Sequence, residues 1–312
     1  MKKDLSNIKK SKFFLNRNEC IGIPTETVYG LAANAYSDLA TSKIFKLKKR
    51  PKNNPLIVHY YSLEKLKKDC KINQNFIKLY KKFCPGPITF ILKLKSKNKI
   101  SKNVTNKKKT LAVRFPKHRV IKSLLKEISY PLAAPSANIS KGISPISKED
   151  VKDEFGKKIK FVLDGGRSKI GLESTIISLI KKPEILRLGG LDRKILERIL
   201  RKKINNNQKS KIETPGRDKL HYSPGIPIRL NAKSKKKNEA FLLIKKRKET
   251  DKDYFYLSKN KNLKEVGRNL YKILRKVRNK RYKKIAIEKI PKKNIGEAIN
   301  DRILKASKKW KI

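Results

Sequence analysis

The sequence has little of what defines several common protein classes. It contains no run of about eighteen apolar residues, so we expect no membrane-spanning helix. Its first residues, MKKDLSNIKKSKFF, lack the apolar core of a secretory signal. The three cysteines, Cys20, Cys70 and Cys84, are widely spaced and form no C-x-x-C pair or Cys/His cluster, which argues against a disulfide framework or a zinc site. These absences predict a cytoplasmic protein without a membrane anchor.

Signatures of several catalytic folds are also missing. There is no phosphate-binding G-x-x-x-x-G-K-[ST], no G-x-G-x-x-G after a strand, no H-E-x-x-H and no G-x-S-x-G. Cys20 and Cys84 lie in apolar or proline-rich surroundings, which favours buried structural thiols over nucleophiles. No covalent catalyst stands out, so the polar residues described below indicate a site that binds and orients its ligands.

Acidic residues are scarce: 26 Asp and Glu stand against 83 Lys and Arg, a formal charge of +57. Such a charge attracts polyanions such as RNA. Lysines spread over every segment, together with abundant Asn and Ile, are also what an A+T-rich genome would produce. The scattered distribution favours composition bias, because a dedicated nucleic-acid surface is normally localised and contains arginine and aromatic residues. Non-specific RNA binding at low salt is expected in either case.

What the sequence does contain is an alternation of short apolar runs and amphipathic stretches over residues 1–205, which predicts a mixed α/β domain. Expected strands are 20–24, 55–59, 88–94, 110–114, 131–134, 161–164, 174–179 and 184–188. Expected helices are 36–47, 62–68, 74–83, 117–128, 147–155 and 192–201. In the stretch GIPTETVYGLAANA at 22–35, the small apolar residues after the polar turn resemble the start of a helix.

The rest of the chain divides into a polar linker and a second ordered region. Residues 206–239 are low in apolar residues apart from the island HYSPGIPIRL at 221–230, and they predict a linker. Residues 240–312 predict a small α/β domain. Its expected strands are 240–245, 254–257 and 284–288, and its expected helices are 263–278 and 296–309.

Polar side chains gather directly after several expected strands, where α/β sheets commonly bind ligands. Thr25, Glu26 and Thr27 follow the strand at 20–24. Threonine hydroxyls can hold a small polar ligand, although a helix N-cap explains a threonine there equally well. Arg114 ends an apolar strand, where its charge needs a partner: either a ligand carboxylate or a buried structural aspartate.

A second group of polar residues combines cations with amides and hydroxyls. Lys48 and Arg50, followed by Asn54 and His59, suit the negative charge of a triphosphate, although a solvated charged turn is the plainer alternative. The loop APSANISKGIS is rich in small residues that let the backbone approach a ligand closely, and a simple Ser/Asn turn explains it about as well.

Taken in order, these motifs resemble a known family. Residues 12–200 contain seven motifs in the order found in the YrdC-type L-threonylcarbamoyladenylate synthases, which this part of the chain resembles. The motifs are PTETVYGL, K-x-R-P-x-x-N-P-L-x-V-H, PGP-x-T, A-V-R-x-P, P-S-A-N-x-S, G-x-x-S-T-I-I and I-L-R-x-G. TPGRDKLHYSPGIPIR resembles the inter-domain loop of the two-domain version of that family, and IGEAINDRILKAS resembles its last helix. The resemblance therefore extends over nearly the whole chain.

The resemblance implies a fold and a reaction. The fold would be a twisted mixed α/β sheet with a large basic cavity (1–205), a linker with the HYSP loop (206–239) and a smaller Rossmann-like α/β domain (240–312). The enzyme would convert L-threonine, bicarbonate or CO2, and ATP accompanied by Mg2+ to threonylcarbamoyl-AMP and pyrophosphate. A separate tRNA threonylcarbamoyl transferase complex would then modify the adenosine beside the anticodon. The alternative is a non-catalytic protein that binds double-stranded RNA or tRNA through the same cavity.

Carried over position by position, the resemblance also implies site residues. The L-threonine pocket would be formed by Thr27, His59, Arg114, Ala134 and Ser174. ATP would be bound by Arg50, Asn54, Thr110, Ser136, Asn138, Ser144, Arg187 and Tyr222. Lys48 and Arg50 would stabilise the departing pyrophosphate, and no metal site built from protein side chains is expected. The chain departs from the usual family pattern at Ala32, Lys141 and Ser178, where Gly, Gly and Asp are common.

Overall fold

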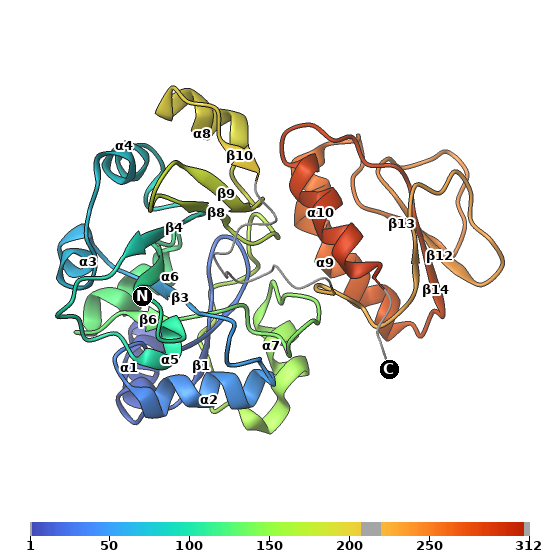
Figure 1. Cartoon of the computed structure of the whole chain (residues 1–312). Coiled ribbons are helices and arrows are strands. Elements are labelled where there is room, and N and C mark those ends of the chain that lie inside the picture. Colours follow the sequence, from blue (N-terminus) through green and yellow to red (C-terminus); the bar gives the residue numbers. More distant parts are fainter. Residues whose placement is uncertain (1, 207–219, 309–312) are drawn as a thin grey trace.

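The computed structural model describes residues 2–206 and 220–308, which form two α/β domains (Figure 1). The first domain is built on a ten-stranded mixed sheet with the order β10-β9-β8-β4-β5-β3-β6-β2-β1-β7. The second contains a four-stranded sheet with the order β11-β14-β12-β13, in which the paired strands are parallel. The predicted fold class, a twisted mixed sheet followed by a smaller α/β domain, is confirmed.

The elements of the first domain alternate along the chain. Its strands are β1 (Ile21–Ile23), β2 (Gly30–Asn34), β3 (Ile57–His59), β4 (Ile88–Lys93), β5 (Thr110–Arg114), β6 (Leu132–Ala133), β7 (Phe161–Val162), β8 (Thr175–Ser178), β9 (Glu184–Arg187) and β10 (Asn205–Asn206). Its helices are α1 (Lys2–Asn16), α2 (Asp38–Lys48), α3 (Leu63–Asp69), α4 (Gln74–Phe83), α5 (Lys102–Thr105), α6 (Arg119–Glu127), α7 (Lys148–Phe155) and α8 (Arg193–Leu200), with a 3-10 turn at Gly156–Lys158.

The second domain places two helices against its parallel sheet. The strands are β11 (Ile228–Arg229), β12 (Glu239–Leu243), β13 (Tyr254–Tyr256) and β14 (Lys284–Ile287), and the helices are α9 (Leu263–Asn279) and α10 (Gly296–Ala306). β11 lies inside the segment predicted to be a linker, so the second sheet takes its edge strand from that segment. Residues 207–219 of the predicted linker lie outside the described residues.

Most elements form where the apolar pattern predicts them. α9 buries Val266, Leu270 and Leu274 on one face, at helical spacing. α7 begins with a capping box in which the Ser147 side chain accepts from the backbone of Asp150, while the Asp150 carboxylate accepts from the backbone of Ser147. Local sequence and burial therefore agree at both helices.

The prediction of a helix start after the polar turn is wrong. Gly30–Asn34 forms β2, which pairs antiparallel with β1 and with β6. Backbone pairing on both edges outweighs the helix preference of alanine, because the strand is buried inside the sheet between β1 and β6. Thr25 therefore caps no helix, and the N-cap alternative for this threonine is excluded.

The two faces of the first sheet are covered differently. Helices α2, α4, α7 and α8 pack into the main core on one face, against residues such as Val58 and Phe90. On the other face, α1 and α6 form a second cluster with β1, β2 and β6. Farther along that face, β3, β4, β5, β8 and β9 carry only a small apolar cluster that includes Ile57 and Ala112. Because side chains alternate along a strand, His59 and Arg114 project from this same face.

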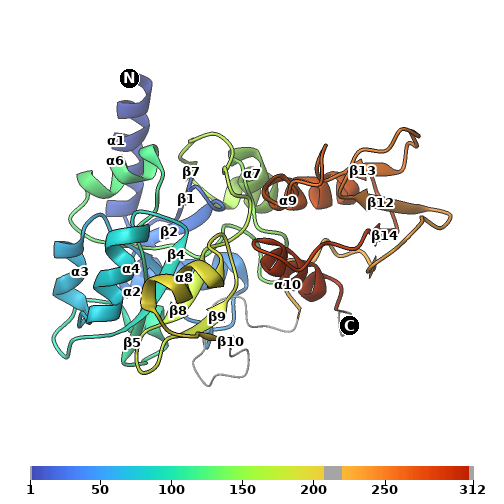
Figure 2. The same ribbon diagram turned by 90° about the horizontal axis from the view of Figure 1, so that it is seen from above.

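The two domains meet through α9 and α10, which lie between the second sheet and the first domain (Figures 1 and 2). On α9, Arg275 donates to the carbonyl of Ile143 at 2.5 Å and pairs with Glu154 at 3.3 Å. Also on α9, Arg268 donates to the carbonyl of Lys169 at 3.0 Å. These contacts anchor the second domain next to the loops that surround the candidate site.

Candidate functional site

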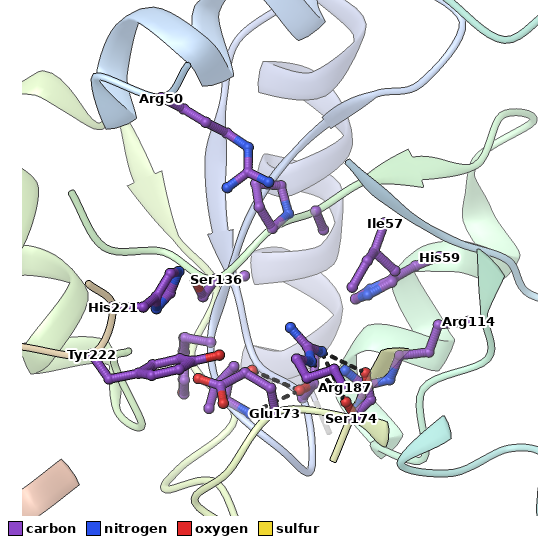
Figure 3. Close-up of a pocket in the computed structure, with 16 residues that line it drawn as sticks. Arg50, Ile57, His59, Arg114, Ser136, Glu173, Ser174, Arg187, His221 and Tyr222 are labelled. Atoms are coloured by element: carbon purple, nitrogen blue, oxygen red, sulfur yellow. Dashed lines mark hydrogen bonds between the residues drawn. The ribbon is translucent and has the colours of Figure 1, made fainter. Parts of the chain in front are cut away.

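A cavity of about 40 Å³ lies where the ends of several strands of the first domain meet the linker. Figure 3 shows His221 and Tyr222 on one side of it and His59 and Arg114 on the other. The lining residues are Thr25, Val28, Tyr29, Gly30, Arg50, Ile57, His59, Arg114, Ala134, Pro135, Ser136, Glu173, Ser174, Arg187, His221 and Tyr222. They come from positions about 200 residues apart in sequence, so only the fold brings them together.

Sheet register places His59 beside Arg114. β3 and β5 are parallel, and His59 pairs directly with Arg114 in their register. Burial, and secondarily the Arg114 charge, lower the pKa of His59 well below its ordinary value, so its imidazole is neutral. Its Nδ1 atom is buried and has no hydrogen-bond partner among the described residues. This end of the cavity therefore presents a cation and a neutral imidazole side by side.

The partner of Arg114 is Glu26, at 2.8 Å between Nη2 and Oε1, and both side chains are buried. The other carboxylate oxygen of Glu26 accepts from the backbone N–H of Lys117 at 3.0 Å. Arg114 Nε has no hydrogen-bond partner in the described part of the chain. The sequence left open whether Arg114 pairs with a ligand carboxylate or with a buried aspartate. In the structure a buried glutamate is its partner, and the Nε edge of the guanidinium has no partner among the described residues.

The polar turn between β1 and β2 is organised by Thr25. Its hydroxyl donates to the carbonyl of Val28 at 2.6 Å, and it accepts from the backbone N–H of Thr27 at 3.2 Å. The two threonine hydroxyls lie 2.9 Å apart. Thr25 lines the cavity, whereas the predicted ligand residue Thr27 lies behind it, fully buried.

Arg187 and Ser174 form one unit. Arg187 donates from Nε and Nη2 to the carbonyl of Ser174, at 3.1 and 2.9 Å, and from Nη2 to its hydroxyl at 3.1 Å. The Ser174 hydroxyl also lies 2.7 Å from that of Thr89. Burial lowers the pKa of Arg187, but an arginine remains charged at neutral pH. The unit places a fixed cation between the two ends of the cavity (Figure 3).

Lys48 and Arg50 lie at different depths. Lys48 is almost completely buried, and its ammonium group donates to the carbonyls of Ser136, at 2.6 Å, and Asn138. Burial, followed by the neighbouring Arg50 charge, lowers its pKa well below the ordinary value. In this structure Lys48 therefore holds the loop that contains Ser136, whereas Arg50 itself lines the cavity.

Of the predicted site residues, eight line the cavity: Arg50, His59, Arg114, Ala134, Ser136, Ser174, Arg187 and Tyr222. Behind this layer lie supporting residues. Asn138 accepts from the Ser136 hydroxyl at 2.6 Å, and Asn54 accepts from Arg50 at 2.5 Å. Thr110 is at the opposite end of β5 from Arg114, roughly 13 Å along the strand. The assignments to ligands stay predictions for all of them.

Glu173 is a charged residue of the cavity lining to which the sequence assigned no role. Its carboxylate accepts from Ser144 at 2.5 Å, from Arg302 at 2.8 Å and from Tyr271 at 3.1 Å. Burial alone would raise the pKa of Glu173, but Arg302 and Arg187 outweigh burial and hold it at about 2. Arg302 and Tyr271 belong to the second domain, so no local motif around Glu173 could have revealed these contacts.

Three structural findings concern the cysteines, metal binding and membranes. Burial raises the pKa of the Cys20 and Cys84 thiols to about 12, as structural thiols require. Among residues 2–206 and 220–308 there is no group of three or more His, Cys, Asp or Glu side chains placed to hold a metal ion. Nor does any helix in these ranges have the length and apolar character needed to cross a membrane.

Comparisons with known proteins give one consistent result. A family model named Sua5_yciO_yrdC and described as "Telomere recombination" matches residues 14–189, and one described as "Threonylcarbamoyl-AMP synthase, C-terminal domain" matches residues 191–308. Proteins named threonylcarbamoyl-AMP synthase are similar over nearly their full length. The one from Pyrococcus abyssi is 34% identical (94% of this chain, 92% of the other), and the one from Bacillus subtilis is 32% identical (96% and 92%).

The structural comparison agrees with the sequence comparison. A crystal structure described as Sua5 from P. abyssi complexed with L-threonine superposes with a TM-score of 0.88, at 33% identity, over 96% of this chain and 94% of that one. A structure of a doubly substituted variant of the same protein superposes with a TM-score of 0.86. The similarity therefore includes both domains.

Proposed function

Because the chain belongs to the Sua5/YrdC family of threonylcarbamoyl-AMP synthases, we propose that it makes threonylcarbamoyl-AMP and pyrophosphate from L-threonine, bicarbonate or CO2, and ATP. One observation carries the proposal. A single cavity has Arg114 and His59 at one end and Arg50 and Tyr222 at the other, as a site that joins an amino acid to a nucleotide requires.

The amino-acid end suits L-threonine. Arg114 can bind the threonine carboxylate through the edge that Glu26 leaves without a partner. His59, neutral because its pKa is lowered, can accept a hydrogen bond from the threonine amino group or hydroxyl. The Ser174 hydroxyl, held by Arg187 and Thr89, can donate to a carbamate oxygen.

The nucleotide end suits a triphosphate. Arg50 and Arg187 supply positive charge on opposite sides of the cavity, and the Ser136 hydroxyl lies between the lysine-supported loop and the cavity. Charge that is already oriented stabilises a leaving pyrophosphate without further rearrangement. Lys48 supports this end by holding the Ser136–Asn138 loop, and its predicted contact with phosphate would require it to release two carbonyls.

The proposed reaction has two steps. The neutral amine of threonine attacks CO2, forming a C–N bond and losing a proton, to give a carbamate. A carbamate oxygen then attacks the α-phosphorus of ATP, and the bond from that phosphorus to the bridging oxygen of pyrophosphate breaks. Carbamates are short-lived in water, so the cavity must exclude solvent between the steps. The burial of Tyr222, at 1% exposed, provides such a closed roof.

The cavity is also too small to hold both ligands without a movement. Small-molecule sites commonly measure about 300–1,000 Å³, far more than the volume of about 40 Å³ found here. We propose that the His221–Tyr222 segment moves away to admit ATP and returns over it. Loop movements of this kind often accompany catalysis.

Magnesium is proposed to enter with ATP. Glu26 and Glu173, the acidic groups at the cavity, are both engaged by arginines, so neither is available to hold a metal of its own. Mg2+ bound to the phosphates would offset their negative charge and would need few protein ligands.

The partners follow from the proposed product. Threonylcarbamoyl-AMP is a reactive anhydride, so a transferase complex acting on tRNA would have to receive it, and the cytoplasm is the proposed location. The alternative of a non-catalytic RNA-binding protein leaves the buried Arg114–Glu26 and Arg187–Ser174 units without a purpose. Non-specific RNA binding through the charge of +57 remains compatible with either function.

The test is pyrophosphate release by the purified full-length chain with ATP and Mg2+. We expect release only when both L-threonine and bicarbonate are present, and formation of threonylcarbamoyl-AMP in equal amount. Release that ignores threonine, or no release from a chain that still binds RNA, would refute the proposed function.

A further inference from the structure

Arg302 of α10 links the second domain to the cavity-lining residue Glu173, and it is 0% exposed. Its Nε donates to Glu173 at 2.8 Å, and its Nη2 donates to the carbonyl of Leu188 at 2.6 Å. Its Nη1 donates to Asp301 at 2.5 Å. A buried guanidinium with every nitrogen engaged has one permitted orientation, because turning it would leave charge without partners.

The guanidinium of Arg302 lies over the ring of Tyr222. The guanidinium carbon of Arg302 is 4.8 Å from the centre of the Tyr222 ring, within the range of a cation–π contact. Tyr271 of α9 stacks on the same ring, with 5.9 Å between centroids and 20° between planes. Tyr271 also lies within 3.1 Å of both carboxylate oxygens of Glu173. Two side chains of the second domain, Arg302 and Tyr271, therefore pack against Tyr222, and both also contact Glu173.

Contacts from other residues are needed to fix the position of the Tyr222 side chain. Its backbone φ is +62°, a left-handed conformation that costs a non-glycine residue free energy. Its hydroxyl is buried and has no hydrogen-bond partner in the described ranges, although it belongs to a cavity-lining side chain. Neither feature is stable by itself, so surrounding contacts must determine where the ring lies.

We propose that Arg302 is a positioning residue for the nucleotide: it holds the Tyr222 ring so that its hydroxyl faces the bound ATP. This inference rests on the proposed function, and it assigns to the second domain a specific part in the site. Arg302 itself does not line the cavity, so it acts through Tyr222.

The experiment compares Arg302→Met with a matched variant, Arg275→Met. Arg275 is also a buried arginine of the second domain that donates to a first-domain carbonyl at 2.5 Å and pairs with a first-domain acid. It touches no described cavity-lining residue in any hydrogen bond or ion pair. Both variants should loosen domain docking, but only Arg302→Met should change the site.

The readouts are the Michaelis constants for ATP and for L-threonine and the dissociation constant of ATP measured by calorimetry without threonine. Arg302→Met should raise both ATP constants about tenfold, the scale of a lost buried cation–π contact. It should change the threonine constant less than about threefold. Arg275→Met should leave both ATP constants within about twofold of wild type. Equal effects of the two variants on ATP would reduce Arg302 to a docking residue and overturn the proposal.

A double-mutant cycle with Tyr222→Ala tests whether Arg302 acts through the ring. In the Tyr222→Ala background, Arg302→Met should weaken ATP binding less than about twofold further. A full further loss would show that Arg302 acts independently of Tyr222, contrary to the proposal. If Arg302→Met does not fold, Arg302→Lys retains the charge and should still weaken ATP binding severalfold, because it loses the planar fork.

Failure of the proposed function has a different signature. A wild-type chain that binds ATP but releases no pyrophosphate would refute the synthase function, while the ATP dissociation constants would still decide the role of Arg302. If the wild-type chain is active and Arg302→Met binds ATP with unchanged affinity, only the positioning role of Arg302 is refuted.

Discussion

Arg114 and Glu26 form a buried ion pair, 2.8 Å from Nη2 to Oε1, at the end of the cavity that also contains His59. The backbone N–H of Lys117 fixes the other oxygen of Glu26. Glu26 thus orients the guanidinium, and the Arg114 Nε edge remains for a ligand carboxylate. Arg114 and Glu26 are 88 positions apart (114 − 26) and make one binding unit, because the end of β5 and the residues after it contact the β1–β2 turn.

Replacing the arginine should separate the two substrates. Arg114→Ala removes the group proposed to bind the threonine carboxylate, so kcat/KM for L-threonine should fall at least about a hundredfold. Calorimetry should find the ATP dissociation constant changed by less than about threefold, since Arg50 and Arg187 remain. Equal losses for both substrates would contradict the assignment.

The Arg114→Ala variant will also be destabilised, by about 3–5 kcal/mol, because Glu26 is left buried without a counter-charge. The matched control is the double variant Arg114→Met/Glu26→Gln, which removes both charges and keeps similar volumes. It should recover most of the unfolding free energy measured in urea, yet it should still fail to bind threonine.

Glu26→Gln should make stability depend more strongly on threonine. The change keeps the hydrogen bond to Lys117 but leaves Arg114 without a carboxylate partner, which the ligand can then replace. Saturating L-threonine should therefore raise the melting temperature of Glu26→Gln by at least about 2 °C more than that of wild type. L-threoninol, which lacks the carboxylate, serves as the control ligand and should shift neither protein. An equal or larger shift in wild type would mean that Glu26 does not share Arg114 with the ligand.

Tyr222 should affect the nucleotide more than the amino acid. Tyr222→Ala removes the closed roof, so the ATP dissociation constant should rise by about tenfold or more while the threonine constant changes severalfold less. Tyr222→Phe retains the ring contacts with Arg302 and Tyr271 and loses only the hydroxyl, so its effect should be smaller. The roof model fails if equilibrium binding of ATP is the same in all three proteins.

His59 should make folding sensitive to acid. Its pKa is lowered by burial, so below its ordinary value of about 6.5 the unfolded chain binds a proton that the folded chain does not. The free energy of unfolding is therefore unaffected by this group above that pH. It decreases as the pH falls below it, by at most about 1.4 kcal/mol per pH unit. Urea unfolding between pH 7.5 and 5 should show a smaller loss for His59→Asn than for wild type. Parallel curves for the two proteins would show that His59 is not a buried neutral imidazole.

Much of this architecture could be predicted from local patterns. Apolar periodicity located α9, and the strand ending at Arg114 was recognised from its apolar run. Alternation and caps are local properties, so they can be read without the fold. The segment at Gly30–Asn34 could not, since alanine favours helices and only pairing with β1 and β6 makes this segment a strand.

The site residues were likewise only partly predictable from the sequence. Ordered motifs identified Arg50, Arg114 and Arg187 as a group that belongs together, and the cavity contains all three. Lys48 was equally prominent in the sequence, yet its ammonium group is engaged by the carbonyls of the Ser136–Asn138 loop. Which cation faces a ligand depends on side-chain direction over a few ångströms, and a motif does not contain that information.

The sequence by itself determined the alternation of strands and helices, the second small domain and the family, because these depend on residue type and spacing along the chain. Only the tertiary structure decided that Glu26 is the partner of Arg114, that Thr25 lines the cavity in front of Thr27, and that Arg302 of the second domain lies against Tyr222. The physical reason is that these partners are far apart along the chain. A buried charge needs a counter-charge, and only the folded structure determines which of many possible residues lies close enough to provide it.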